Sequence, residues 1–163
     1  MRTMFIIIVL GLLGLTGWAM YSIRTVTHDP AIWHVDPLTA TPSQYPNYYR
    51  VARSDLTEWP VQQEAEIYAA NAATVAAAFD AFVVAQPRVD RVAGTVEEGW
   101  LTYVQRTESF QFPDYISVRF YDIDDTGKST LAIYSRSRFG QGDMGVNEAR
   151  VKSWLTSIDS FKE

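Results

Sequence analysis

The fold is decided by two stretches in the last third of the chain, Tyr115–Ile123 (YISVRFYDI) and Ser129–Arg138 (STLAIYSRSR), with Asp124–Lys128 (DDTGK) between them. In the first stretch apolar residues alternate with polar or aromatic ones, and this two-residue period is typical of a strand that buries one face. The connecting residues favour a hairpin turn. We therefore predict an antiparallel pair of strands, with Ile116, Val118 and Phe120 on one face and Ser117, Arg119 and Tyr121 on the other.

Further strands and a helix are predicted before this hairpin. Val89–Val96 and Trp100–Arg106 have β character, and the residues between them form a turn. Asn71 can cap a helix that ends at Pro87, and a short strand is expected over Glu64–Ala70. The apolar face of that helix comprises Val75, Phe79, Phe82 and Val83.

A last helix is expected to begin near Asn147 and to bury Val151, Trp154, Leu155 and Ile158. The order of elements is then β-α-β-β-β-β-α, with short turns between consecutive strands. This order predicts an α+β domain in which helices pack on one face of an antiparallel sheet.

Residues 1–24 are expected to form a transmembrane anchor. Met4–Ile23 carries no charge, and a helix of that length spans about 30 Å, the hydrocarbon thickness of a bilayer. A cleaved signal peptide is the alternative, because Gly17-Trp18-Ala19 offers small residues where a signal peptidase cuts. The amino terminus and Arg2 favour an inside position for that end, which places the rest of the chain in the periplasm of a bacterium.

Gly11, Gly14 and Gly17 recur every three residues inside this anchor. Small residues at near-helical spacing let another helix approach closely. Glycine is also simply common in membrane helices, and a three-residue spacing drifts around the helix, so this second explanation is favoured over helix packing.

Residues 25–49 are expected to form an extended strap, and residues 50–163 a soluble α+β domain. The strap contains Pro30, Pro37, Pro42 and Pro46, which restrict the backbone and hold the preceding residues extended. Its apolar and aromatic side chains are costly to leave in water. We expect the strap to lie against the domain or against a neighbouring protein.

Composition excludes several classes of function. The 163 residues are 47% hydrophobic and 20% charged, which is typical of a folded chain and not of a disordered one. A net charge of −5 without a basic block argues against nucleic acid as a partner. Because cysteine is absent, disulfides, thiolate metal sites and cysteine nucleophiles are excluded.

Three local patterns resemble known sites, and each lacks an essential part. Gly140–Gly145 (GQGDMG) matches a dinucleotide-binding turn, yet nearly all the residues after it are one helix, so the required second strand is missing. Asp122–Gly127 begins like a calcium loop, but Ile133 stands where the bidentate carboxylate belongs. His28 and His34 lie in a proline-rich segment without a rigid frame. We predict no metal site, no cofactor and no catalytic residue set.

The densest group of polar residues follows the last strand. Alternation places Arg136 and Arg138 on the face of Tyr134, and Ser135 and Ser137 on the opposite face. Two arginines on one face repel each other unless a carboxylate or an anion lies between them.

Asp143 is the expected internal partner of these arginines, and Arg150 adds a third guanidinium at the start of the last helix. One interpretation is a salt-bridge network that fixes the loop. The other is a pocket for a small anion or carboxylate at the helix N-terminus. The candidate cluster comprises Asp114, Arg136, Arg138, Asp143, Asn147 and Arg150.

Arg136–Gly140 (RSRFG) and Asp143–Arg150 (DMGVNEAR) together resemble the signature of a family of domains of unknown function, DUF1499. Phe112–Tyr115 and Val96–Trp100 are similar to weaker motifs of that family, and the resemblance covers the chain from about Tyr49 to its end. It implies an envelope or membrane-associated bacterial protein with no established reaction. It also implies that Arg136, Arg138, Asp143, Asn147 and Arg150 form the family's polar core, with a role that the resemblance does not give.

The leading functional hypothesis is a single-pass protein of the bacterial inner membrane with a periplasmic, non-catalytic domain. It would serve as an interaction or accessory subunit of a membrane protein complex, with the bilayer and other integral membrane proteins as partners. The alternative is a domain that binds a small ligand, an anion or a lipid, with an apolar pocket between the sheet and the first helix. An enzyme that acts through Asp114, Asp143 and the arginines is the least favoured hypothesis.

Overall fold

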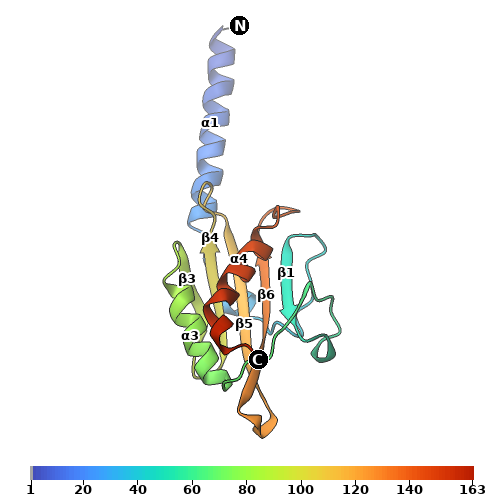
Figure 1. Ribbon diagram of the computed structural model, residues 1–163. Coiled ribbons are helices and arrows are strands. Elements are labelled where there is room, and N and C mark those ends of the chain that lie inside the picture. The colour runs from blue at the N-terminus through green and yellow to red at the C-terminus, as the bar shows by residue number, and fades with distance from the viewer. Residues whose placement is uncertain (1) are drawn as a thin grey trace.

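The computed structural model describes residues 2–163 and shows an α+β domain with a long helix at its amino-terminal end (Figure 1). That helix, α1 (Arg2–Arg24), is followed by a one-turn helix, α2 (Pro30–Trp33). The domain then contains six strands, the helices α3 (Ala72–Val84) and α4 (Val146–Leu155), and three short 3-10 turns. The strands are β1 (Tyr48–Ala52), β2 (Gln63–Glu64), β3 (Val89–Thr95), β4 (Trp100–Arg106), β5 (Pro113–Ile123) and β6 (Lys128–Ser137).

The strands form one mixed sheet in the order β2-β1-β6-β5-β4-β3. Consecutive strands from β3 to β6 pair antiparallel through hairpins, and β1 pairs antiparallel with β6. Only the short β2 runs parallel to its neighbour β1. The hairpin of β5 and β6 therefore lies at the centre of the sheet.

The first strand differs from the prediction. Of the predicted strand over 64–70, only Glu64 lies in a strand, and Tyr68 forms isolated bridges to Ser129 and Lys162. The strand that extends the sheet beyond β6 is β1, which spans the expected border between strap and domain. Its alternation is hard to recognise in the sequence because Arg50, a charged residue, is fully buried in its middle.

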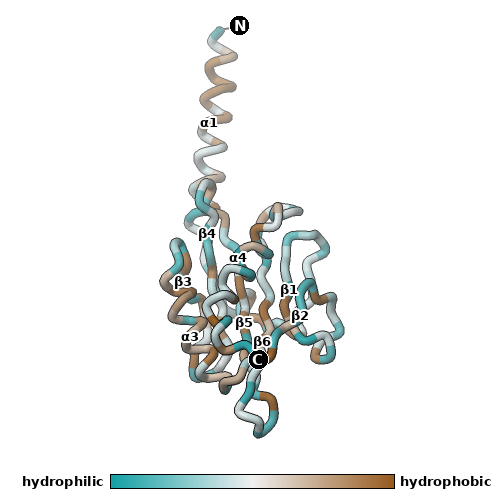
Figure 2. The backbone as a smooth tube through the Cα atoms, viewed as in Figure 1, coloured by the Kyte–Doolittle hydropathy of each residue, from teal (hydrophilic) through white to brown (hydrophobic). Residues whose placement is uncertain are grey.

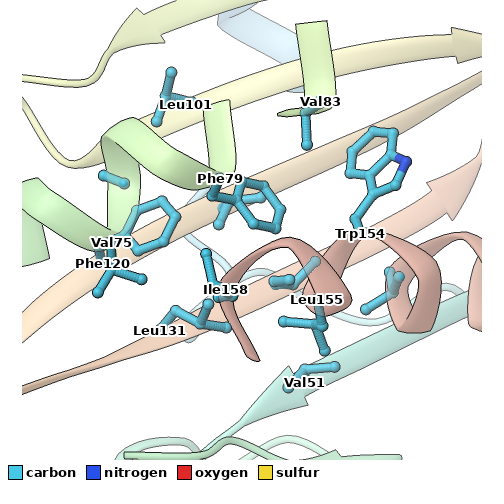
Figure 3. Close-up of a cluster of buried hydrophobic side chains, with 14 of the residues drawn as sticks. Val51, Val75, Phe79, Val83, Leu101, Phe120, Leu131, Trp154, Leu155 and Ile158 are labelled. Atoms are coloured by element: carbon cyan, nitrogen blue, oxygen red, sulfur yellow. The ribbon is translucent and has the colours of Figure 1, made fainter. Parts of the chain in front are cut away.

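Helices α3 and α4 cover the same face of the sheet (Figure 1). Figure 3 shows Phe79 of α3 and Trp154 of α4 turned toward each other over the strands, with ring centroids 6.2 Å apart. Leu101, Phe120 and Leu131 supply the sheet side of this core. The faces predicted for β5 and β6 are confirmed, because the residues expected on the apolar face lie in this core.

The predicted ends of α3 are also found. Asn71 accepts a hydrogen bond at its side-chain oxygen from the Thr74 backbone N–H at 2.8 Å, and the helix ends at Val84, three residues before Pro87. An asparagine cap satisfies a backbone donor that the first turn leaves free.

The other face of the sheet is covered by residues 27–43, a segment that lies within the proline-rich strap. The Trp33 ring stacks on Tyr115 with centroids 3.7 Å apart, and Asp36 forms an ion pair with Arg119. Asp29 caps α2 by accepting from the Ala31 backbone N–H, so the strap contains one helical turn that the prolines did not predict. The sheet is thus enclosed on both faces.

Helix α1 is long and apolar enough to cross a membrane, and none of its residues is buried. Figure 2 shows it as a largely hydrophobic rod that stands away from the domain. Gly11, Gly14 and Gly17 have no neighbouring atoms within 4 Å of an added Cβ, so this part of the helix surface is open. The Arg106 guanidinium donates to the Ile23 carbonyl at 3.2 Å, which fixes the end of α1 beside the end of β4.

Candidate functional site

The sheet divides the predicted polar cluster into two groups. Arg136 of β6 and Arg138, the residue after its end, project toward the strap, as the alternation predicted. Asp114, Asn147 and Arg150 lie on the helix-covered face. A single pocket built from all of these residues is therefore not formed.

On the helix face, Arg150 and Asp114 form a buried ion pair. Their closest atoms, Nη2 and Oδ2, are 2.6 Å apart, and the side chains are only 5% and 4% exposed. Arg150 also donates from Nε to Gln105 at 2.6 Å and from Nη1 to Asn147 at 2.7 Å. Asn147 in turn accepts from the Ser135 hydroxyl at 2.6 Å. With its hydrogen bonds satisfied in this way, the network joins α4 to strands β4, β5 and β6.

Asp143 does not pair with Arg136 or Arg138, so that prediction is wrong. Its carboxylate accepts hydrogen bonds from the backbone N–H groups of Gly145 and Asn147, at 3.1 and 2.9 Å. It therefore stabilises the first turn of α4, where a negative charge is favourable.

On the strap face, aromatic rings and carbonyl oxygens take the place of the expected carboxylate. Arg136 donates to the Trp33 carbonyl at 2.9 Å, and its guanidinium carbon lies 5.3 Å from the centre of the Trp33 ring. Arg138 lies 5.3 Å from the same ring and donates to the Thr27 carbonyl at 3.0 Å. Burial lowers the pKa of Arg136 to about 10. The two arginines thus hold the strap on the sheet by cation–π and hydrogen-bond contacts.

The two histidines act as further contacts between strap and sheet. His28 lies between the Tyr115 hydroxyl, 2.7 Å from Nδ1, and Arg106, 3.0 Å from Nε2. His34 contacts the Thr102 hydroxyl at 2.9 Å, and its ring stacks on Trp100. Burial lowers the pKa of both rings, and the charge of Arg106 lowers that of His28 further. Within residues 2–163, no group of three potential metal-ligating side chains comes together.

Arg50 is a buried cation that the sequence did not single out. Its Nη2 donates to the Ala40 carbonyl, its guanidinium lies over the Tyr134 ring, and Nε and Nη1 have no partner among the described residues. Burial lowers its pKa. A charged residue inside a short strand such as β1 is the signal that sequence reasoning passed over.

A groove of about 470 Å³ opens at the end of the domain from which α1 leaves. It lies between the loop that joins β4 to β5 and the loop that joins β6 to α4, and the apolar side chains around it are Phe110, Phe112, Phe139, Met144 and Val146. The space between the sheet and α3, where the alternative hypothesis placed a pocket, is filled by the core. Phe110 and Phe112 within a polar loop were the sequence signal for the groove.

The comparisons with known proteins assign no activity. A family model described as "Protein of unknown function (DUF1499)" matches residues 34–158. No curated protein matches the chain. The matched range starts inside the strap and excludes α1.

Proposed function

The chain belongs to the DUF1499 family, whose model covers well over half of its residues, and we propose that it is a single-pass membrane protein. The description of the family names no activity, and in this proposal the domain acts by binding at the bilayer surface. In this proposal α1 spans the inner membrane of a bacterium and the domain lies on the periplasmic side. The domain is non-catalytic and binds no nucleic acid.

The observation that supports a position at the bilayer is the attachment of α1 to the sheet. Arg106 donates to the Ile23 carbonyl and also to the Gln111 carbonyl, at 3.2 and 2.9 Å, so one side chain joins the end of α1 to the loop after β4. Arg138 holds Thr27 at the end of β6. The domain is therefore held by a short, bound connection and not by a free tether.

This attachment gives the domain one orientation. The loops after β4 and β6 lie at the end that carries α1, while the hairpin between β5 and β6 points the opposite way (Figure 1). If α1 spans the bilayer, these two loops face the lipid headgroups. Phe110 and Met144 in them are 55% and 100% exposed, which is costly in water and favourable at a membrane interface.

A non-catalytic role agrees with how the charged groups are engaged. Asp114 and Arg150 form a buried ion pair, and the Asp143 carboxylate already accepts hydrogen bonds from backbone N–H groups. An accessory role beside other integral membrane proteins stays a prediction. The open surface of α1 at Gly11, Gly14 and Gly17 could accommodate another helix, but it does not identify one.

Spin labels at single cysteines test the position of the domain, since the natural chain has no cysteine. The variants Phe110→Cys and Met144→Cys are labelled in the full chain in phosphatidylglycerol–phosphatidylcholine nanodiscs, with Asp125→Cys in the distant hairpin as control. We expect the first two labels to collide more often with oxygen than with a water-soluble nickel complex, and the control label to do the reverse. Equal exposure of all three labels to the nickel complex would refute the proposal.

Two simple measurements test anchoring and orientation. The intact mass of the mature protein should include α1, because a chain cut after Ala19 would be a secreted protein. In spheroplasts, the Asp125→Cys variant should react with a membrane-impermeant thiol reagent. Protection of that cysteine until the cells are broken would place the domain in the cytoplasm.

A further inference from the structure

The groove at the membrane-facing end has a continuous aromatic wall. The rings of Phe110 and Phe112 lie 5.7 Å apart, and those of Phe112 and Phe139 lie 6.0 Å apart. Phe112 thus connects the loop after β4 to the loop after β6. The volume of about 470 Å³ lies within the range of roughly 300–1,000 Å³ that is usual for ligand pockets.

The lining suits an uncharged, apolar chain. It contains no lysine, arginine or histidine that could bind an anionic group. Two of its carboxylates are already engaged, Asp114 by Arg150 and Asp143 by the start of α4. Met144 is fully exposed, and Phe139 and Val146 are 39% and 41% exposed, so the rim presents apolar surface to whatever lies outside.

We propose that one acyl chain of a membrane lipid lies in this groove, taken from the leaflet in which α1 ends. The inference rests on the proposed function, because it requires this end of the domain to face the bilayer. The Arg106 contact to Ile23 holds the end of α1 beside the end of β4, and the loop that follows β4 forms one side of the groove, so the groove lies close to the lipid that would surround α1. Once it lies in the groove, the acyl chain covers apolar side chains that water would otherwise contact.

A photoreactive lipid tests this assignment. The full chain is placed in nanodiscs that contain phosphatidylcholine with a diazirine near the end of one acyl chain, and the adducts formed under ultraviolet light are mapped by peptide mass spectrometry. We expect adducts on residues 107–112 and 138–146 as well as on α1. Adducts confined to α1 would overturn the inference.

The variant Gly142→Phe tests whether the acyl chain lies in the groove, because its ring would compete with the acyl chain for the same space. Gly142 lines the groove, a Cβ there meets no atom within 4 Å, and its backbone is not left-handed, so a ring can be added at the groove without a clash at Cβ. The yield of adducts on the two loops should fall about tenfold in this variant. This is the change in affinity expected if the ring displaces two methylene groups of the acyl chain from the groove. Gly142→Ala is the matched control and should keep the wild-type yield. Val146→Phe narrows the groove from α4 and serves as a second, independent test.

The outcomes separate this inference from the proposed function. Loop adducts that persist unchanged in both phenylalanine variants would mean that the loops touch the bilayer while the groove stays without a chain. That result, or missing loop adducts together with spin labels in the interface, would overturn the inference and leave the proposed function standing. Water-exposed spin labels would overturn both.

Discussion

Removing the charge of Asp114 should destabilise the domain strongly, because it breaks the buried ion pair of the polar cluster. In Asp114→Asn, the Arg150 guanidinium keeps its place between α4 and the sheet but loses the carboxylate partner that lies 2.6 Å away. Both side chains are nearly inaccessible to water, so solvent cannot replace the lost charge.

The magnitude follows from this burial. Breaking a buried ion pair by removing one partner costs about 3–5 kcal/mol, because the remaining charge is left uncompensated. The contacts of Arg150 with Gln105 and Asn147 remain, since they use neutral acceptors, so we expect a loss near the lower end, about 3 kcal/mol. The double variant Asp114→Asn/Arg150→Gln should lose about 1–3 kcal/mol less than the sum of the two single variants.

Urea unfolding of the full chain in a mild non-ionic detergent measures these losses, with tryptophan fluorescence as the signal. Asp143→Ala is the matched control, because Asp143 is also acidic but accepts only backbone N–H groups at the start of α4, and its loss should cost only about 1 kcal/mol. The reasoning fails if Asp114→Asn is no less stable than Asp143→Ala, or if the double variant loses the full sum.

Three other predictions concern the strap and one glycine of β3. The pKa of both His28 and His34 is lowered in the folded state, so the unfolded chain binds protons more readily. The stability of the domain should therefore fall as the pH is lowered from about 7.5 to about 5.5. In calorimetry, the variant His28→Gln/His34→Gln should show a smaller drop in Tm over this range than the unmodified protein. Trp33→Ala should cost about 2–4 kcal/mol and expose the strap to limited proteolysis, whereas wild-type resistance would contradict the strap contacts. Gly94→Ala should cost about 3 kcal/mol or more in the same urea assay, because φ is +80° and the new Cβ would lie 1.9 Å from the Trp100 carbonyl oxygen. Normal stability would refute this account of the close approach between β3 and β4.

The sequence predicted the elements whose signals are local. The alternation in β5 and β6 placed Ile116 and Arg136 on opposite faces correctly, because side chains of a strand alternate whatever surrounds them. The Asn71 cap and the long apolar run of α1 were readable for the same reason. β1 was missed because Arg50 interrupts its pattern, and only burial under the strap makes that charge tolerable there.

The candidate site depended on contacts that no local pattern contains. The spacing placed Asp143 close to Arg138 along the chain, yet the turn before α4 directs Asp143 to backbone N–H groups instead. Arg138 finds the Thr27 carbonyl, and Arg150 finds Asp114, both far away in the sequence.

An apolar helix, a strand hairpin with two distinct faces, and helices to cover one of them could all be read from the sequence. Three features followed only from the fold: the proline-rich segment covers the other face, the sheet separates the arginines into two groups, and two loops form a groove at the end that carries α1. Periodicity fixes the direction of each side chain within its element, whereas its partners depend on packing between elements that are distant along the chain.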